Sequence, residues 1–183
     1  AESAAVLCVF DNEELGSGTM QGADSTFLED TLVRVCEALG RSGAEYRAAL
    51  NQSFMVSADN AHAVHPNHPE FADRIDRPAI NGGIVIKFNA NQKYTTDSVS
   101  AAVFAELCRD AGVPVQRFTN RADMPGGSTL GNISSAHVSV DTVDIGLPQL
   151  AMHSCYETAG ARDTEYLIRA AHELFSRSFR RGR

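Results

Sequence analysis

Short apolar runs and longer amphipathic segments alternate along the chain. The apolar runs, which have the length and composition of buried strands, are residues 4–10, 54–58, 83–88, 115–118 and 138–145. Apolar residues recur at helical spacing in the segments 23–39, 44–50, 97–111 and 164–175. Strands that alternate with helices predict an α/β fold with a largely parallel sheet and helices on both faces.

Acidic residues directly follow the first apolar run. Glu13 and Glu14 are adjacent there, and glycines follow at positions 16, 18 and 22. Adjacent side chains at the end of a strand point in different directions, so one carboxylate can bind a metal while the other accepts a proton from water. The glycines allow a tight turn that leaves room for a ligand. A solvated acidic loop is the alternative, and it is the more common outcome for an isolated Glu-Glu pair.

Two further candidate ligands follow other predicted strands. Asp59 comes after the 54–58 run, and His153 lies in the loop beyond the 138–145 run. Functional groups of α/β sheets gather at the carboxyl ends of the strands, so we expect these side chains and the two glutamates at one edge. Carboxylates and imidazoles hold zinc or manganese in hydrolytic sites, and a pair of ions about 3.5–4 Å apart can polarise a carbonyl. Each residue alone is more often a surface acid or a structural histidine.

Composition narrows the function classes. The chain has 183 residues, enough for one domain with a core, and a formal net charge of −7, which disfavours nucleic-acid and anionic-membrane partners. Its four cysteines show no C-x-x-C spacing, which favours free thiols in a reducing cytoplasm. The sequence contains no signal peptide, no membrane-length apolar run and no Gly-x-Ser-x-Gly element. These features favour a cytoplasmic protein without serine-hydrolase chemistry.

Three blocks of sequence resemble the aspartyl aminopeptidase family, peptidase family M18. They are FDNEELGS at 10–17, SADNAHAVHPN at 57–67 and MHS at 152–154, in matching order and spacing. The similarity extends over nearly the whole chain and includes Asn81-Gly82-Gly83, Lys87 and the 126–131 glycine loop. The resemblance implies a co-catalytic zinc exopeptidase (phosphorylase/hydrolase-like) fold. It also implies removal of N-terminal, notably acidic, residues from peptides by metal-activated water.

The resemblance assigns roles to the candidate residues. Glu13 is implied as the general base, Glu14 and His153 as ligands to one metal ion, and Asp59 as a ligand to the other. The complete family site holds two divalent ions, zinc with manganese or cobalt as alternatives. The family also forms homo-oligomers, which are dodecamers, so a homo-oligomer is expected here.

Four residues are candidates for binding the peptide substrate. Lys87 can pair with an acidic substrate side chain, although a lysine that extends to solvent is nearly as common an outcome. His62 is expected beside the metal ligands or the substrate, with a loop-anchoring role as the alternative. Gly127 and Ser128 can offer backbone N–H groups to a tetrahedral intermediate. A simple glycine turn before a short helix from Ser128 is the alternative.

The sequence departs from the family pattern in one respect. The family also uses a histidine in an H-x-D arrangement and a bridging aspartate, both upstream of the Asp-Asn-Glu-Glu block, and residues 1–183 contain neither. We therefore expect residues 1–183 to be the carboxyl-terminal portion of the catalytic domain, without the amino-terminal part and the dimerisation domain. Such a chain has an incomplete metal site and is expected to be inactive alone. A non-catalytic assembly module and another co-catalytic zinc exopeptidase remain as alternative functions.

Overall fold

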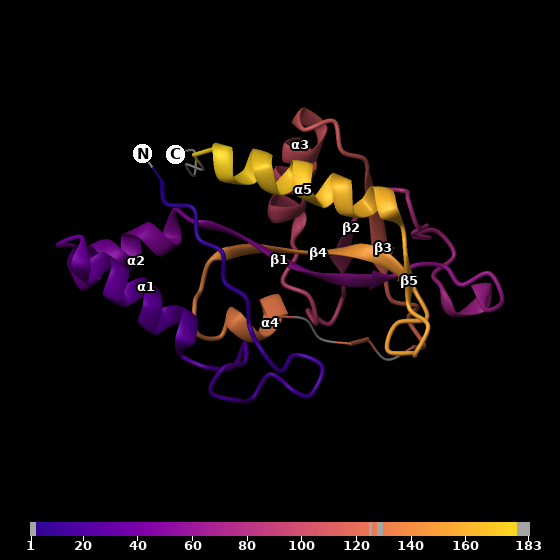
Figure 1. Ribbon diagram of the computed structural model, residues 1–183, viewed down its shortest axis with the longest axis horizontal. Coiled ribbons are helices and arrows are strands. Elements are labelled where there is room, and N and C mark those ends of the chain that lie inside the picture. Colours follow the sequence, from indigo (N-terminus) through magenta and orange to yellow (C-terminus); the bar gives the residue numbers. More distant parts are fainter. Residues whose placement is uncertain (1–2, 125, 128–129, 179–183) are drawn as a thin grey trace.

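The computed structural model describes residues 3–124, 126–127 and 130–178. The helices are α1 (Phe27–Ala38), α2 (Gly43–Asn51), α3 (Ser98–Asp110), α4 (Leu130–Ser134) and α5 (Ala161–Ser176), with a 3₁₀ turn η1 (Pro69–Phe71). The strands are β1 (Phe54–His62), β2 (Ile84–Phe88), β3 (Val115–Thr119), β4 (Asp141–Leu150) and β5 (Thr158–Ala159). Figure 1 shows how these elements are arranged around one sheet.

The sheet joins two parallel pairs of strands. Its order is β1-β4-β2-β3, with β5 beside β4. β1 and β4 are parallel along their length, from Phe54–Asp141 to His62–Gln149, and β2 and β3 are parallel as well. Short antiparallel pairings join β4 to β2 and to β5. The predicted α/β class is therefore confirmed. The sheet is mixed, but its longest strand pairings are parallel, as expected.

Helices cover both faces of the sheet. α3 and α5 lie on one face, α4 lies on the other, and α1 and α2 lie together at one end of the molecule (Figure 1). The main core fills the space between the sheet and the pair α3–α5. It contains Ile84, Ile86, Phe104, Leu107, Cys108, Val113, Val143, Ile145 and Ala170. This packing gives the sheet one continuous apolar face.

The opposite face of the sheet has a smaller apolar cluster and more polar groups. Side chains alternate between faces along a strand, so Ile84 and Ile86 of β2 enter the main core while Val85 and Lys87 point the other way. Val85 packs in a second cluster with Ala61, Tyr94 and Phe118. The polar site described below lies on this second face.

The predicted buried strand at 4–10 is wrong. These residues form no helix or strand, and Leu7 and Val9 are 79% and 80% exposed. A strand needs a neighbour for its backbone N–H and C=O groups. The apolar pattern indicates a strand locally, but none of the sheet pairings found in the described part of the chain includes this segment.

Two other strands are longer than their apolar runs. β1 continues to His62, so Asp59 and His62 lie within the strand rather than in the loop after it. β4 begins at Asp141 and continues to Leu150, beyond the expected end at residue 145. The parallel β1–β4 pairing extends through these polar residues, because backbone hydrogen bonds to a neighbouring strand do not depend on side-chain polarity.

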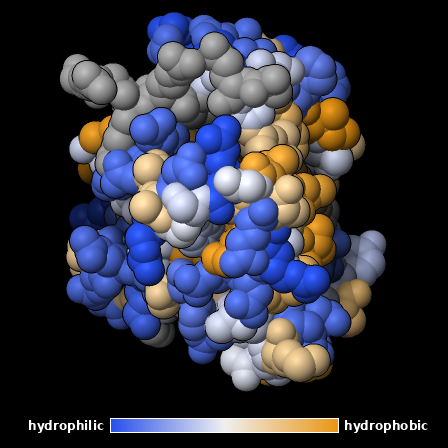
Figure 2. All heavy atoms as spheres, turned by 90° about the vertical axis from the view of Figure 1, so that its left-hand side faces the viewer, coloured by the Kyte–Doolittle hydropathy of each residue, from blue (hydrophilic) through white to orange (hydrophobic). Residues whose placement is uncertain are grey.

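The end of the molecule that carries α1 and α2 is mainly hydrophilic, with separate apolar patches (Figure 2). Exposed apolar side chains of α1 include Phe27 and Val35. Scattered apolar side chains of this kind are normal on protein surfaces. Among the described helices, none has both the length and the apolar composition needed to cross a membrane.

Candidate metal centre and active site

One cavity of about 690 Å³ brings the predicted site residues together. It is lined, among others, by Glu13, Glu14, Asp59, His62, Lys87, Gly127 and His153. Ser128, the remaining predicted site residue, lies outside the described residues. The expectation that residues distant in sequence converge on one cavity is therefore met for all seven predicted residues that the structure describes.

The parallel pairing of β1 and β4 brings two of the candidate ligands, Asp59 and His153, towards the same end of the sheet. Asp59 of β1 pairs with Gly146 of β4, and both strands then run towards the same edge of the sheet. β4 continues into a hairpin with β5, and His153 lies in the turn of that hairpin. A backbone hydrogen bond from Ala63 N to Gln149 O (2.9 Å) keeps the two strand ends together.

A compact turn holds the two glutamates. Asn12 has a positive φ of 61°, and backbone N–H groups of Leu15 and Gly16 donate to the carbonyls of Asn12 (3.2 Å) and Glu13 (3.1 Å). Further along the loop, a Cβ at Gly22 would lie 2.1 Å from the Ser17 carbonyl oxygen. Only glycine permits that close approach. The glycines predicted to shape this loop thus include one that the backbone geometry requires.

Glu14 and His153 contact each other directly across the cavity. The distance from His153 Nε2 to Glu14 Oε2 is 2.9 Å, and the side chains are 64% and 68% exposed, respectively. A solvent-exposed pair of this kind contributes at most about 1 kcal/mol. The turn that presents His153 contains two non-glycine residues with positive φ, Ala151 (54°) and His153 (67°). Such residues cost on the order of 1–3 kcal/mol each, so the contact between Glu14 and His153 alone does not offset this backbone conformation.

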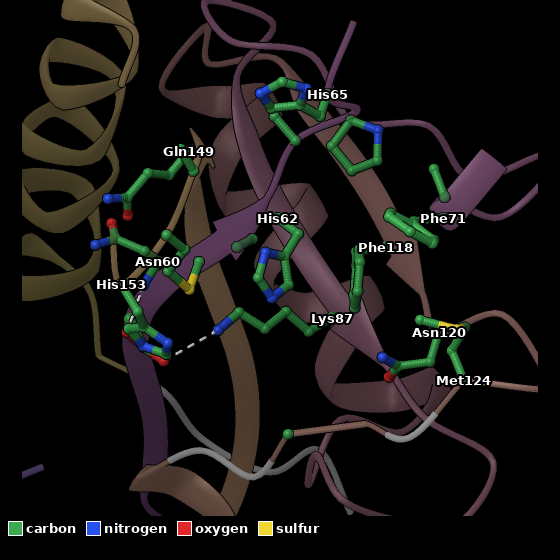
Figure 3. A pocket seen from close by; sticks show the side chains of 18 of the residues that line it. Asn60, His62, His65, Phe71, Lys87, Phe118, Asn120, Met124, Gln149 and His153 are labelled. Carbon is green, nitrogen blue, oxygen red and sulfur yellow. Dashed lines mark hydrogen bonds and ion pairs between the residues drawn. The ribbon is translucent and has the colours of Figure 1, made fainter. Parts of the chain in front are cut away.

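Lys87 and Asp59 form the buried part of the site. Lys87 Nζ lies 3.4 Å from Asp59 Oδ2, and the lysine side chain is only 3% exposed. Its ammonium also lies 5.6 Å from the centre of the Tyr94 ring. Figure 3 shows Lys87 extended across the cavity, with a dashed line that marks its interaction with the carboxylate. Lys87 is therefore buried in the cavity, and the alternative in which it extends to solvent is excluded.

The electrostatic environment shifts the pKa values of three of the candidate site residues. Partial burial raises the pKa of Glu13, and the nearby carboxylates of Asp59 and Glu14 act in the same direction. Burial lowers the pKa of Lys87, while Asp59 opposes this shift. Burial and the charge of Lys87 lower the pKa of His62. The cavity therefore disfavours additional charge of either sign on its partly buried groups.

The donors at the cavity fit a divalent transition metal in type but not in number. Glu14 and His153 offer a carboxylate oxygen and an imidazole nitrogen at one point, the ligand types that zinc prefers. Catalytic zinc ions generally have three protein ligands. Among the residues that the structure describes, no group of three or more His, Cys, Asp or Glu side chains is arranged to hold a metal. Within the described residues, the arrangement therefore offers two donor side chains, Glu14 and His153, at one point of the cavity.

Sequence reasoning missed several residues of the cavity wall. Phe118 of β3, Phe71 of η1, Met124 and Tyr94 line it, and Figure 3 shows Phe71 and Met124 at the end away from His153. Burial raises the pKa of Tyr94 to about 12, so its hydroxyl stays protonated. Glu157 accepts a hydrogen bond from His153 N (2.5 Å). These residues stand in segments without a motif, so only their positions in the fold indicate a role.

Comparisons with known proteins place this chain in a family. The profile of the family described as "Aminopeptidase I zinc metalloprotease (M18)" matches residues 1–175. A probable M18 family aminopeptidase 2 of Clostridium acetobutylicum is 52% identical over 176 residues, which are 96% of this chain and 41% of that protein. The chain thus spans about two fifths of the length of this curated relative.

Solved structures agree with this result. A chain in the cryo-EM structure of the Ape4 and Nbr1 complex superposes with a TM-score of 0.88 at 44% identity, over 91% of this chain and 31% of that one. The S. cerevisiae mApe1 dodecamer gives a TM-score of 0.77 at 30% identity, over 91% of this chain and 36% of that one. On the match to the family profile and the agreement in fold, this chain belongs to peptidase family M18.

Proposed function

We propose that the chain is the carboxyl-terminal portion of the catalytic domain of a metal-dependent aminopeptidase, which removes N-terminal residues from peptides. The observation that carries this proposal is the convergence of Glu13, Glu14, Asp59 and His153 on one cavity in a member of family M18. Metal ligands and a free carboxylate are the groups that hydrolysis of a peptide bond requires.

In this proposal Glu14 and His153 hold one divalent ion, and Asp59 is a ligand of a second. Zinc is the expected metal, with manganese and cobalt as alternatives, and the remaining ligands come from outside this chain. Bound ions would polarise the scissile carbonyl and make water acidic enough to attack near neutral pH. The short Glu14–His153 distance supports their assignment to the same ion, because both donor atoms already face one point.

Glu13 is the proposed general base. Its carboxylate accepts a proton from the attacking water and returns it to the leaving amine. A general base works best when its pKa lies near the working pH, and burial and the neighbouring carboxylates raise the pKa of Glu13 towards that range. Glu13 is also less exposed than Glu14, which supports the division of roles between the two glutamates.

Lys87, His62 and the glycine-rich loop are proposed to bind the substrate. Lys87 presents a cation in a buried part of the cavity, which favours an acidic side chain at the peptide N-terminus. Its contact with Asp59 competes with such a substrate, so a preference for neutral residues is the alternative. Gly127 lines the cavity and can donate its backbone N–H to the tetrahedral intermediate. Ser128 is proposed for the same task.

The complete enzyme is proposed to be a cytoplasmic homo-oligomer, by analogy with the S. cerevisiae relative solved as a dodecamer. A second candidate function is a non-catalytic assembly module that keeps the fold. It is favoured by one observation, namely that no described group of three donors is arranged to bind a metal.

Activity of a Glu13→Gln variant tests the proposal. A chimera would join the amino-terminal part of the Clostridium acetobutylicum relative to this chain, and aminoacyl p-nitroanilides with aspartyl, glutamyl and leucyl groups would serve as substrates after reconstitution with zinc. We expect Glu13→Gln to lower kcat by about 10²–10⁴-fold while zinc content stays unchanged. Glu14→Gln is the matched comparison and should lose zinc together with activity. An active Glu13→Gln variant, or a zinc-loaded chimera without activity on any of the substrates, contradicts the proposal.

A further inference from the structure

Two carboxylates are completely buried and have no part in the proposed mechanism. Asp144 of β4 and Asp163 of α5 are both 0% exposed. Burying an ionised carboxylate is costly unless donors surround it. Each of these residues therefore needs hydrogen-bond donors from the surrounding fold for its carboxylate oxygens.

Asp163 has a role in the scaffold. Its oxygens accept hydrogen bonds from Asn81 N (2.6 Å) and Gly83 N (3.0 Å), which attach the loop before β2 to the first turn of α5. None of these three residues lines the cavity. Asp163 is thus a control for Asp144: it is equally buried, but it holds a part of the fold outside the cavity.

Asp144 attaches a segment of the cavity wall to the sheet. Its Oδ2 accepts hydrogen bonds from Thr95 N (2.6 Å) and Thr95 Oγ1 (2.7 Å). The backbone N of Asp144 donates to Thr96 Oγ1 (2.9 Å). Tyr94, the residue before Thr95, lines the cavity and places its ring 5.6 Å from Lys87 Nζ. The carboxylate therefore fixes the segment that holds Tyr94 against Lys87.

The second oxygen of Asp144 lies against the helix that follows the glycine-rich loop. A Cβ at Gly131, in the first turn of α4, would lie 2.5 Å from Asp144 Oδ1 and 2.8 Å from Ser57 Cβ. Only a residue without a side chain allows α4 to come so close. The first turn of α4 is thus packed directly against this carboxylate and against Ser57 of β1.

Asp144 also lies beside Lys87. The antiparallel register pairs Ile86 with Ile145, so the next positions, Lys87 and Asp144, are neighbours on the cavity face of the sheet. The negative charge of Asp144 stabilises the ammonium of Lys87, as do Asp59 and Glu13. Opposite charges attract strongly where water is excluded. Lys87 is therefore held between Asp59, Tyr94 and Asp144.

We propose that Asp144 is the positioning residue of this site: it fastens the Tyr94–Thr95 segment beside Lys87, packs against the first turn of α4 and so shapes the substrate-binding side of the cavity. Asp144 acts through these neighbours, because it does not line the cavity itself. The effect of Asp144 on catalysis rests on the proposed function. Its role in holding the Tyr94–Thr95 segment rests only on the contacts described above.

Amide hydrogen exchange tests whether Asp144 holds the Tyr94–Thr95 segment, and it requires no measurement of enzyme activity. In the chain itself, Asp144→Asn removes the charge but keeps the shape, and Asp163→Asn is the matched control with the same burial. Hydrogen bonds to charged groups are roughly twice as strong as neutral ones. We expect Asp144→Asn to speed exchange at Thr95 and in α4 while Asn81 and Gly83 stay protected, and Asp163→Asn to give the opposite pattern. Unchanged exchange at Thr95 in Asp144→Asn would overturn the proposal.

Kinetics of the chimera test the catalytic consequence. We expect Asp144→Asn to lower kcat/KM about 10–100-fold, with a larger change in KM for aspartyl than for leucyl substrates because Lys87 is displaced. Asp163→Asn should retain kcat/KM even if its melting temperature falls equally. Equal kinetic losses in both variants would show a merely structural role and would overturn the proposal.

A second pair of variants covers the case in which Asp144→Asn does not fold. Thr95→Ser keeps both donors to Asp144, whereas Thr95→Val loses the hydroxyl. Thr95→Ser should behave as the wild type, and Thr95→Val should show the KM effect; identical behaviour of the two would count against Asp144. If the wild-type chimera hydrolyses no substrate, the proposed function fails, and hydrogen exchange at Thr95 still decides the role of Asp144.

Discussion

At the scale of single residues, the site combines groups whose charges are partly buried. Lys87 is 3% exposed and has its ammonium 3.4 Å from Asp59 Oδ2, on a sheet face that also contains Asp144. A buried lysine is stable as a cation only when opposite charges are near. The geometry of Asp59, a proposed metal ligand, is thus linked to a proposed substrate-binding residue. Binding of a metal ion by Asp59 and binding of substrate by Lys87 would therefore both affect the contact between these two side chains.

His62 is expected to make the stability of the chain depend on pH. Burial and Lys87 lower the pKa of His62 in the folded chain, whereas the unfolded chain has the ordinary value of about 6.5. Between the two values the unfolded chain binds more protons. The free energy of unfolding should therefore fall as the pH drops through about 6.5, and the loss is complete below the folded pKa.

A His62→Gln variant isolates this contribution. Urea unfolding from about pH 7.5 to about pH 5 should show a smaller pH dependence for the variant than for the wild type. The difference should stay well below about 1.4 kcal/mol per pH unit, because part of the His62 side chain reaches solvent. Parallel curves for the two proteins would contradict the shifted pKa of His62.

At the scale of elements, side-chain caps fix where two of the helices begin. Asp97 accepts a hydrogen bond from Ser100 N (2.7 Å), and Ser100 Oγ accepts one from Asp97 N (3.0 Å), which is a capping box at the start of α3. Ser42 and Glu45 form the same motif at α2. α3 packs against the main core, whereas α2 contacts mainly α1.

We expect the two caps to differ in their contribution to stability. Asp97→Ala should lower the free energy of unfolding by about 1–2 kcal/mol, and Ser42→Ala by about 0.5–1 kcal/mol. The difference arises because the Asp97 cap is partly buried and Ser100 is 3% exposed. Denaturant titration measures both values, with Asp97→Asn as the control that retains the cap. A larger loss for Ser42→Ala would contradict this ranking.

At the scale of the whole molecule, the chain is proposed to supply one side of a metal centre. Glu14, Asp59 and His153 reach the same cavity from three separate segments, yet no group of three donors within the described residues is arranged around one ion. The chain also spans only 41% of the Clostridium acetobutylicum relative. Complete metal binding is therefore expected to need residues beyond those of this chain.

Zinc titration of the isolated chain tests this expectation. Its binding free energy for Zn²⁺ should be much weaker than the about 10–16 kcal/mol of complete structural zinc sites. His153→Ala should remove the residual binding, whereas His172→Ala, at an exposed position of α5 outside the cavity, should leave it unchanged. Tight zinc binding, or aminopeptidase activity of the isolated chain with zinc, would contradict the proposed incomplete site.

Most elements follow from local patterns in the sequence. The spacing of apolar residues predicts α1, α2, α3, α5 and the positions of β1 to β4. The 4–10 run is the exception: its composition favours a strand, but none of the strands that the structure describes pairs with it. Pairing depends on segments far away in the sequence, so a local pattern cannot decide it.

The sequence by itself determined which chemical groups are available. The carboxylates, the imidazole and the lysine of the site follow from motifs whose order and spacing are those of a metallopeptidase. Only the tertiary structure decided how these groups face one another. The 2.9 Å contact of Glu14 with His153 and the burial of Lys87 beside Asp59 depend on strand register and a strained turn. The role of Asp144, which belongs to no motif, depends on backbone groups that only the packed fold brings to its carboxylate.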